Sequence, residues 1–254
     1  MSNIVEGEGY LIFDEFLSSD ELFALQLYMQ FENYYLVHSQ GWSKSWRMTD
    51  GEPLVSVSYF YSLLTGKTTI DDNVIMDGIH ILSEKISIIT SRLRDFLGED
   101  WNAFSLTTFL YPAGSGLGWH EDDAQYKGAY IFYAHPEWKP NWGGELCVIN
   151  TPVNSSAGLS EQTYNASEEV LRMSGITGGT VGPEFGWTIR ERSINDSGIG
   201  TFIYPKPNRL VIIKPNYSHC IKRLMSVLGT LCVVPLLVFF IKAEATAGNQ
   251  YRPF

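Results

Sequence analysis

Two histidines and one aspartate carry the clearest chemical signal in this chain. His120 and Asp122 stand two residues apart, just after the strand-like run 105–111, and His219 follows a later apolar run at 210–213. Two imidazole nitrogens and one carboxylate oxygen form a ligand set for Fe(II) that leaves coordination positions open for small molecules. A His-x-Asp pair alone is a weak signal, because it often occurs by chance. The alternative interpretation is a histidine in a surface loop with an unrelated acidic neighbour. The second histidine after a later strand makes a metal site the better interpretation.

Short strands are the elements that must position these residues. They are rich in β-branched and aromatic residues and are separated by Gly, Pro and Asn. Together with an N-terminal helical part, they predict an α+β, mainly β fold, namely a double-stranded β-helix (jelly-roll or cupin-like) with helices packed outside. The three ligand candidates would then meet at one mouth of the barrel. The predicted strands cover residues 105–111, 129–134, 146–150, 200–204, 210–214 and 230–241.

The N-terminal part predicts one strand, at 9–17, and two helices that buttress the sheet. Ser18 or Ser19 caps the first helix, and two acidic residues follow in its first turn, where the helix dipole favours them. The second helix is expected over 77–97, with apolar residues at helical spacing, and Gly98 ends it.

Length and composition predict a single domain of residues 1–254. Within it, we expect helical support over 1–100, a β-helix core over 101–150 and 200–241, and a lid-like insertion over 151–200. The insertion is rich in Gly, Ser and Thr and long for a connection, and such segments are either lids or disordered. A short helix near 168–173 is plausible there.

Charge and cysteine usage exclude several classes of protein. A formal net charge of −10 argues against a nucleic-acid partner, because binding phosphates requires clustered Lys and Arg. Cys147, Cys220 and Cys232 are odd in number and show no Cys-x-x-Cys pattern, which fits free buried thiols in a reducing compartment. There is no signal-peptide pattern, and the apolar run 231–241 is too short to span a bilayer. We therefore expect a cytoplasmic protein with no membrane partner. The oligomeric state is left open.

The flanks of the ligand candidates resemble a known family. Segments 111–122, 130–146 and 207–215 are similar to the prolyl-4-hydroxylase-like branch of the 2-oxoglutarate and Fe(II)-dependent oxygenases. The most specific block is Trp138-x-x-x-Trp142-Gly143-Gly144-Glu145-Leu146. The resemblance covers about residues 100–150 and 200–241, and it adds little over the N-terminal hundred residues or over 151–200.

This resemblance implies a non-haem iron dioxygenase. His120, Asp122 and His219 would hold Fe(II), and 2-oxoglutarate and O2 would take the open positions. Halogenases of the family carry a small residue in place of Asp122, so hydroxylation or another oxidation of a C–H bond is expected. The substrate would be a small molecule or a modified peptide. Because members of the family often modify natural products, the resemblance suggests natural-product tailoring.

The sequence departs from the family at the co-substrate anchor. The strand after the distal histidine usually carries an Arg or Lys for the far carboxylate of 2-oxoglutarate, but segment 229–240 has none. A dicarboxylate needs a fixed cation, preferably a bidentate Arg. Thr107 and Tyr111 could add hydrogen bonds to that carboxylate. Candidate cations elsewhere are Arg223, Arg209, Lys214, Lys127, and the pair Arg190 and Arg192 in the insertion.

Two alternatives follow from this departure. The chain could be an iron-dependent oxidase that takes its electrons from the substrate and does not use 2-oxoglutarate. It could also be a non-catalytic metal-binding β-helix protein. The retained ligand candidates favour an enzyme, because packing alone does not require two histidines and an aspartate at strand ends.

Overall fold

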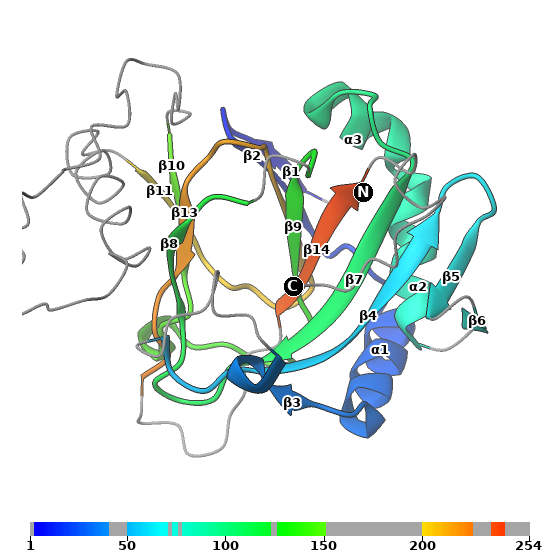
Figure 1. Ribbon diagram of the computed structural model, residues 1–254. Coiled ribbons are helices and arrows are strands. Elements are labelled where there is room, and N and C mark those ends of the chain that lie inside the picture. The colour runs from blue at the N-terminus through cyan, green and yellow to red at the C-terminus, as the bar shows by residue number, and fades with distance from the viewer. Residues whose placement is uncertain are drawn as a thin grey trace, which may run out of the picture.

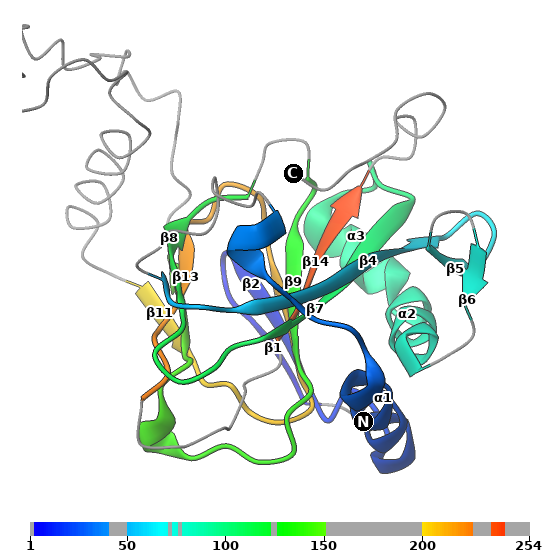
Figure 2. The ribbon, with the colours of Figure 1, turned by 60° about the horizontal axis from the view of Figure 1, so that its bottom comes forward.

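Two β-sheets lie face to face in the computed structural model, and the helices α1, α2 and α3 cover the outer face of the larger sheet (Figures 1 and 2). The structure describes residues 3–40, 50–70, 73–75, 78–122, 126–150, 200–225 and 235–241. The expectation of a mainly β fold with a few supporting helices is confirmed. Among the described residues, no helix has both the length and the apolar character needed to cross a membrane.

The larger sheet has ten strands and the smaller one four. The larger sheet runs in the order β1 (Ile4–Glu6), β2 (Tyr10–Asp14), β12 (Arg209–Ile213), β9 (Ala129–Tyr133), β14 (Pro235–Ile241), β7 (Ala103–Leu110), β4 (Leu54–Ser62), β5 (Lys67–Ile70) and β6 (Asn73–Ile75), with β3 (Tyr35–Leu36) paired to β4. The smaller sheet runs β11 (Gly200–Ile203), β10 (Leu146–Ile149), β13 (His219–Ile221) and β8 (Leu117–His120). Short 3₁₀ turns, η1 (Val37–Gln40) and η3 (Pro140–Trp142), complete the described elements.

Alternation along the strands produces two apolar layers. On β7, Phe104 and Leu106 face the helices, whereas Phe109 and the following Tyr111 lie between the two sheets. Successive strand side chains point to opposite faces, so one strand of the larger sheet serves both layers. The ligand candidates lie next to this inter-sheet layer.

Helix α1 (Ser19–Phe31) begins as the sequence predicts. Ser18 is the N-cap: its hydroxyl accepts from the Glu21 backbone N–H at 3.3 Å, and the Glu21 carboxylate accepts from the Ser18 N–H at 2.7 Å. This reciprocal pair satisfies two backbone donors that the first helical turn would otherwise leave unpaired.

The prediction of one helix over 77–97 is wrong. The structure has two helices, α2 (Gly78–Ile88) and α3 (Thr90–Leu97), separated at Ile89. The run Ile88-Ile89-Thr90 is β-branched and has weak helix propensity. The Thr90 hydroxyl donates to the Ser87 carbonyl at 2.7 Å, which offers the backbone another partner at the break. Gly98 ends α3 as expected, with a φ of 91°.

The N-terminal hundred residues are also more β-rich than the sequence suggests. Strand β4 forms seven register pairs with β7, between Leu54↔Leu110 and Ser62↔Ala103, and so belongs to the larger sheet. Its alternating aromatic and β-branched residues are typical of a strand, but they precede the region where strands were expected. The expected insertion, apart from Gly200, lies outside the described residues, as does the short helix near 168–173.

Candidate metal centre

The two histidines lie opposite each other in the smaller sheet. Strand β8 ends at His120, strand β13 begins at His219, and the antiparallel register pairs these two residues directly. Asp122 follows two residues after His120, so the same strand end supplies an imidazole and a carboxylate. The long-range pairing of β8 with β13 therefore brings the three ligand candidates together.

The ligand atoms of these residues converge on one small volume. One ligand atom from each of His120, Asp122 and His219 lies within 4.8 Å of the others. His120 Nε2 lies 3.9 Å from Asp122 Oδ1, and His219 Nε2 lies 3.8 Å from Asp122 Oδ2. These distances are too long for hydrogen bonds. They fit atoms that share one ion, since each bond to a metal measures about 2.0–2.2 Å.

Backbone carbonyls fix the state of both imidazoles. His120 Nδ1 lies 2.9 Å from the Gly118 carbonyl oxygen, and His219 Nδ1 lies 3.0 Å from the Tyr217 carbonyl oxygen. A carbonyl only accepts, so each Nδ1 carries the proton and each Nε2 keeps a lone pair for a ligand bond. His219 Nε2 is buried and has no hydrogen-bond partner among the described residues. A metal ion would satisfy this atom.

Burial shapes the charge of the site. The Asp122 side chain is only 10% exposed. Burial raises its pKa, His219 lowers it, and Glu121 raises it further. A neighbouring cation would favour the charged form of this buried carboxylate. Two imidazole nitrogens and one carboxylate therefore suit a divalent ion.

A hydrogen bond outside the ligand set connects the two strands. The Ser218 hydroxyl donates to Glu121 Oε1 at 2.7 Å. Ser218 directly precedes His219, and Glu121 lies between His120 and Asp122. Glu121 is not one of the three residues whose ligand atoms converge, and it has this buried hydroxyl as a partner. Strand alternation could have indicated that Ser218 and Glu121 lie on the face of the smaller sheet opposite to the two histidines. The sequence contains no signal that these two distant residues form a pair.

Solved structures with the same fold are known. No protein-family model and no curated protein sequence matches the chain. A prolyl-4-hydroxylase from Pseudomonas putida superimposes with a TM-score of 0.55 at 14% identity, covering 92% of this chain and 93% of that one. A prolyl hydroxylase from Trichoplax adhaerens, in complex with a peptide fragment of the hypoxia-inducible-factor oxygen degradation domain, gives 0.52 at 16% identity, covering 95% and 88%. The chain shares the fold of these two prolyl hydroxylases.

Thr107 lies on β7 in the larger sheet, and Tyr111 directly follows the end of that strand. Thr107 is 5% exposed, and its hydroxyl lies 2.8 Å from the Ser58 hydroxyl on β4. Tyr111 is fully buried in the inter-sheet layer, and burial, Tyr133 and Asp50 raise its pKa, so it stays protonated. A protonated phenol can donate a hydrogen bond to a carboxylate.

The candidate cations among the described residues either lie away from the ligand candidates or contact other groups. Arg223 is exposed and follows the end of β13 that lies away from His219. Arg209 makes a two-point contact with Asp14, at 2.7 and 3.0 Å. Lys214 Nζ lies 4.5 Å from the centroid of the Phe96 ring, and Lys127 Nζ lies 3.7 Å from Asp100 Oδ2. Arg190 and Arg192 lie outside the described residues.

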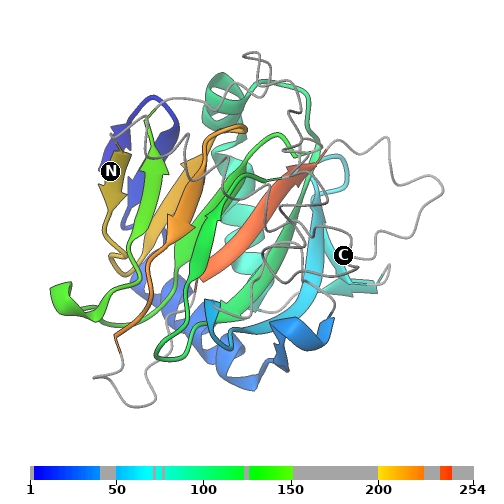
Figure 3. The same cartoon turned by 60° about the vertical axis from the view of Figure 1, so that its left-hand side comes forward.

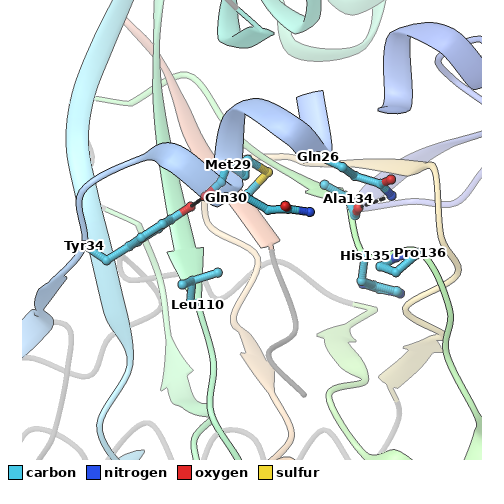
Figure 4. Close-up of a pocket in the computed structure, with 8 residues that line it drawn as sticks. All are labelled: Gln26, Met29, Gln30, Tyr34, Leu110, Ala134, His135 and Pro136. Carbon is cyan, nitrogen blue, oxygen red and sulfur yellow. Dashed lines mark hydrogen bonds between the residues drawn. The ribbon is translucent and has the colours of Figure 1, made fainter. Parts of the chain in front are cut away.

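A separate pocket of about 320 Å³ lies on the helix side of the larger sheet (Figure 4). It is lined by parts of α1, by Leu110 at the end of β7, and by residues 134–136 after β9. In sequence, His120 at the end of β8 leads to Ala129 at the start of β9, and Ile213 at the end of β12 leads to His219. The pocket residues 134–136 follow the opposite end of β9. The pocket therefore lies away from the ligand candidates.

Proposed function

We propose that this protein is a non-haem Fe(II) oxygenase of the 2-oxoglutarate-dependent type, which hydroxylates or otherwise oxidises a C–H bond of a small molecule or peptide. The observation that carries the proposal is the convergence of His120, Asp122 and His219, with His219 Nε2 buried and without a partner among the described residues. The fold shared with prolyl hydroxylases supports the same class. We also propose that the two sheets form the double-stranded β-helix of that class.

The protein residues would divide the work as follows. His120 and His219 bind through Nε2 as neutral imidazoles, and Asp122 binds through a carboxylate oxygen. Bound iron supplies the activation of O2. The Gly118 and Tyr217 carbonyls orient the two rings, and the Ser218–Glu121 hydrogen bond keeps the strand ends in place. Thr107 and Tyr111 would offer hydroxyl donors to the co-substrate carboxylate between the sheets.

The cation for the far carboxylate of 2-oxoglutarate is part of the same proposal. Arg190 and Arg192, in the insertion 151–200, are the candidates we favour, since a lid that closes over the mouth would bring them in and would exclude water. The exposure of Arg223 and its position beyond the far end of β13 weigh against it. Unchanged 2-oxoglutarate affinity in an Arg190→Ala/Arg192→Ala double variant would reject this anchor.

One observation favours a second candidate function. The described cations Arg209, Lys214 and Lys127 are engaged with other groups, so an iron oxidase without 2-oxoglutarate is also compatible with the site. Such an enzyme would take the electrons for O2 reduction from its own substrate. A peptide substrate is compatible with either function, since the Trichoplax adhaerens enzyme was solved with a peptide.

Two experiments test the proposal. Anaerobic Fe(II) titration should show strong binding by the wild type and by a His38→Ala control, and a large loss of affinity in His120→Ala, Asp122→Ala and His219→Ala. Unchanged affinity in all three would reject the metal site. O2 uptake and succinate release, measured with and without 2-oxoglutarate, should both depend on 2-oxoglutarate. Uptake without 2-oxoglutarate would favour the oxidase, and no turnover of any substrate would favour a non-catalytic metal-binding protein.

A further inference from the structure

Two cysteines lie directly opposite each other next to the candidate metal centre. The register of β10 and β13 pairs Cys147 with Cys220. On one side of this pair the Ile149 N–H donates to the Ser218 carbonyl at 3.0 Å, and on the other the Lys222 N–H donates to the Glu145 carbonyl at 2.9 Å. Hydrogen-bonded pairs recur at every second position of an antiparallel ladder, so the cysteines form such a pair, with a Cα separation of about 5.5 Å. That separation lies inside the range that a disulfide spans, roughly 4.4–6.8 Å.

Both thiols lie on the outer face of the smaller sheet, which comes forward in Figure 3. The neighbouring residues Leu146, Val148 and Ile221 belong to the inter-sheet core, so alternation directs Cys147 and Cys220 to the opposite face. Cys220 is 4% exposed, whereas Cys147 is partly exposed. An oxidant in solution therefore meets Cys147 first, with a second thiol beside it.

The two thiols also interact. A hydrogen bond with Cys220 lowers the pKa of Cys147, and the Lys222 ammonium lowers it further, against the opposing effect of burial. The thiolate is the reactive form of cysteine, so these effects add to the exposure of Cys147 in making it the attacking thiol of the pair.

We propose that Cys147 and Cys220 are a reversible redox pair, which peroxide converts into a cross-strand disulfide that alters the metal centre. The Cys147 sulfur attacks one peroxide oxygen, giving a sulfenic acid and one water. The Cys220 sulfur then attacks the Cys147 sulfur, and the S–O bond breaks with release of a second water. The two thiols lose two protons and two electrons in total, and the peroxide is reduced by those two electrons.

The effect on the metal centre rests on the function proposed above and follows from chain connectivity. Cys220 directly follows His219 in a strand of three residues, His219–Ile221. A disulfide requires a Cβ–Cβ distance of about 3.8 Å, which is shorter than a hydrogen-bonded pair normally provides. Closing the bond therefore draws β13 toward β10 and shifts His219 relative to His120. The resulting strain also makes the bond easy to reduce.

Thiol chemistry tests the redox pair without reference to the metal. The full chain carrying Cys232→Ser, stripped of metal to prevent iron–peroxide reactions, is treated with one equivalent of hydrogen peroxide. Two thiols should disappear, peptide mapping should find Cys147 joined to Cys220, and dithiothreitol should restore both thiols. The matched variants each keep one thiol: Cys220→Ser/Cys232→Ser, which retains the partly exposed Cys147, should be oxidised by peroxide faster than Cys147→Ser/Cys232→Ser, which retains the buried Cys220. Retention of both thiols, or separate oxidation of Cys147 to sulfinic acid, would overturn the pair.

Cobalt(II) binding tests the coupling, with the visible absorption of the bound ion as the readout. The oxidised Cys232→Ser protein should bind Co(II) about tenfold more weakly than the reduced protein, comparable to the loss of an outer ligand partner. Peroxide should not change the affinity of the Cys147→Ser/Cys232→Ser variant. Equal affinity in both redox states would reject the coupling, whereas no Co(II) binding in either state would reject the metal site on which it rests.

Discussion

Ser218 donates a hydrogen bond of 2.7 Å to Glu121, and this contact connects the two strand ends that carry the ligand candidates. Ser218 is 1% exposed, so water does not easily replace its partner. Because each residue is adjacent in sequence to a histidine of the site, the hydrogen bond limits how far His120 and His219 can separate. It can preserve the geometry of the site before any metal enters.

Removing this hydrogen bond should weaken metal binding while the fold is retained. We expect Ser218→Ala to lower the Co(II) affinity by about tenfold, as for other outer partners of ligands. Glu121→Gln keeps an acceptor oxygen and should stay close to the wild type. Ser87→Ala removes a hydroxyl that donates within helix α2 and serves as the control, with no expected change in affinity. Wild-type affinity in Ser218→Ala would contradict the positioning role.

A buried histidine outside the site should make stability depend on pH. His135 is 3% exposed, and its Nε2 lies 2.9 Å from the Pro205 carbonyl. Burial lowers its pKa from 6.5 to about 4, against a smaller raising effect of that hydrogen bond. Between these pKa values the unfolded chain binds the proton and the folded chain does not. The stability contributed by neutral His135 is therefore complete above pH 6.5 and is lost as the pH falls toward 4.

Urea unfolding at pH 7 and pH 4.5 measures this effect. Between pH 7 and pH 4.5 the free energy of unfolding of the wild type should fall by up to about 3 kcal/mol more than that of His135→Gln. This follows from about 1.4 kcal/mol for each unit of pKa difference. Both proteins share the remaining titrating groups, so their difference isolates His135. An identical loss in the two proteins would show that His135 is not held neutral.

The ion pair between β2 and β12 should contribute far more to the free energy of unfolding than an exposed ion pair does. Asp14 is 13% exposed and contacts Arg209 and Lys206. Burial raises the Asp14 pKa, but the hydrogen bonds and charges of these two residues outweigh it and lower the pKa overall. Its contribution is therefore present at neutral pH and lost as the pH falls through the lowered value. Asp14→Asn should cost roughly 2–4 kcal/mol in urea unfolding, because it leaves Arg209 half-paired.

The exposed Glu6–Arg92 pair provides the comparison. Its side chains are 50% and 37% exposed, so solvent screens the interaction. We expect Glu6→Gln to change the unfolding free energy by less than about 1 kcal/mol. Equal effects of Glu6→Gln and Asp14→Asn would show that burial and the two-point contact of Arg209 add nothing.

The glycines of the Trp-Gly-Gly block have a steric reason to be glycines. Gly143 has a φ of 78°, and a Cβ there would lie 2.1 Å from the Arg223 carbonyl oxygen. Gly143→Ala must therefore move the backbone after β13, and we expect it to cost more than about 2 kcal/mol in thermal or urea unfolding. Gly114→Ala is the matched control, with a φ of 85° and no atom within 4 Å of its Cβ. Similar costs for both would leave only the positive φ as the cause.

Local physical chemistry made part of this protein predictable. The Ser18 cap, the end of α3 at Gly98 and the strands at 103–110, 129–133 and 209–213 follow from residues close together in the chain. The His120-x-Asp122 spacing likewise follows from one strand end. The prediction was wrong at the break in the second helix, where neighbouring signals competed. Ile88 and Ile89 extend the apolar helical stripe, yet the run from Ile88 to Thr90 is β-branched and has weak helix propensity. Strand β4 was also missed, although its alternating pattern is typical of a strand.

The tertiary structure decided which distant residues meet. Pairing β8 with β13 places His219 opposite His120, brings Ser218 to Glu121, and, through β10, places Cys220 opposite Cys147. A register shift of one residue would have turned each of these side chains to the other face of the sheet. That register is set by the apolar side chains between the two sheets, among them Leu117, Val148 and Ile221, which reach their positions only when the whole inter-sheet layer is packed.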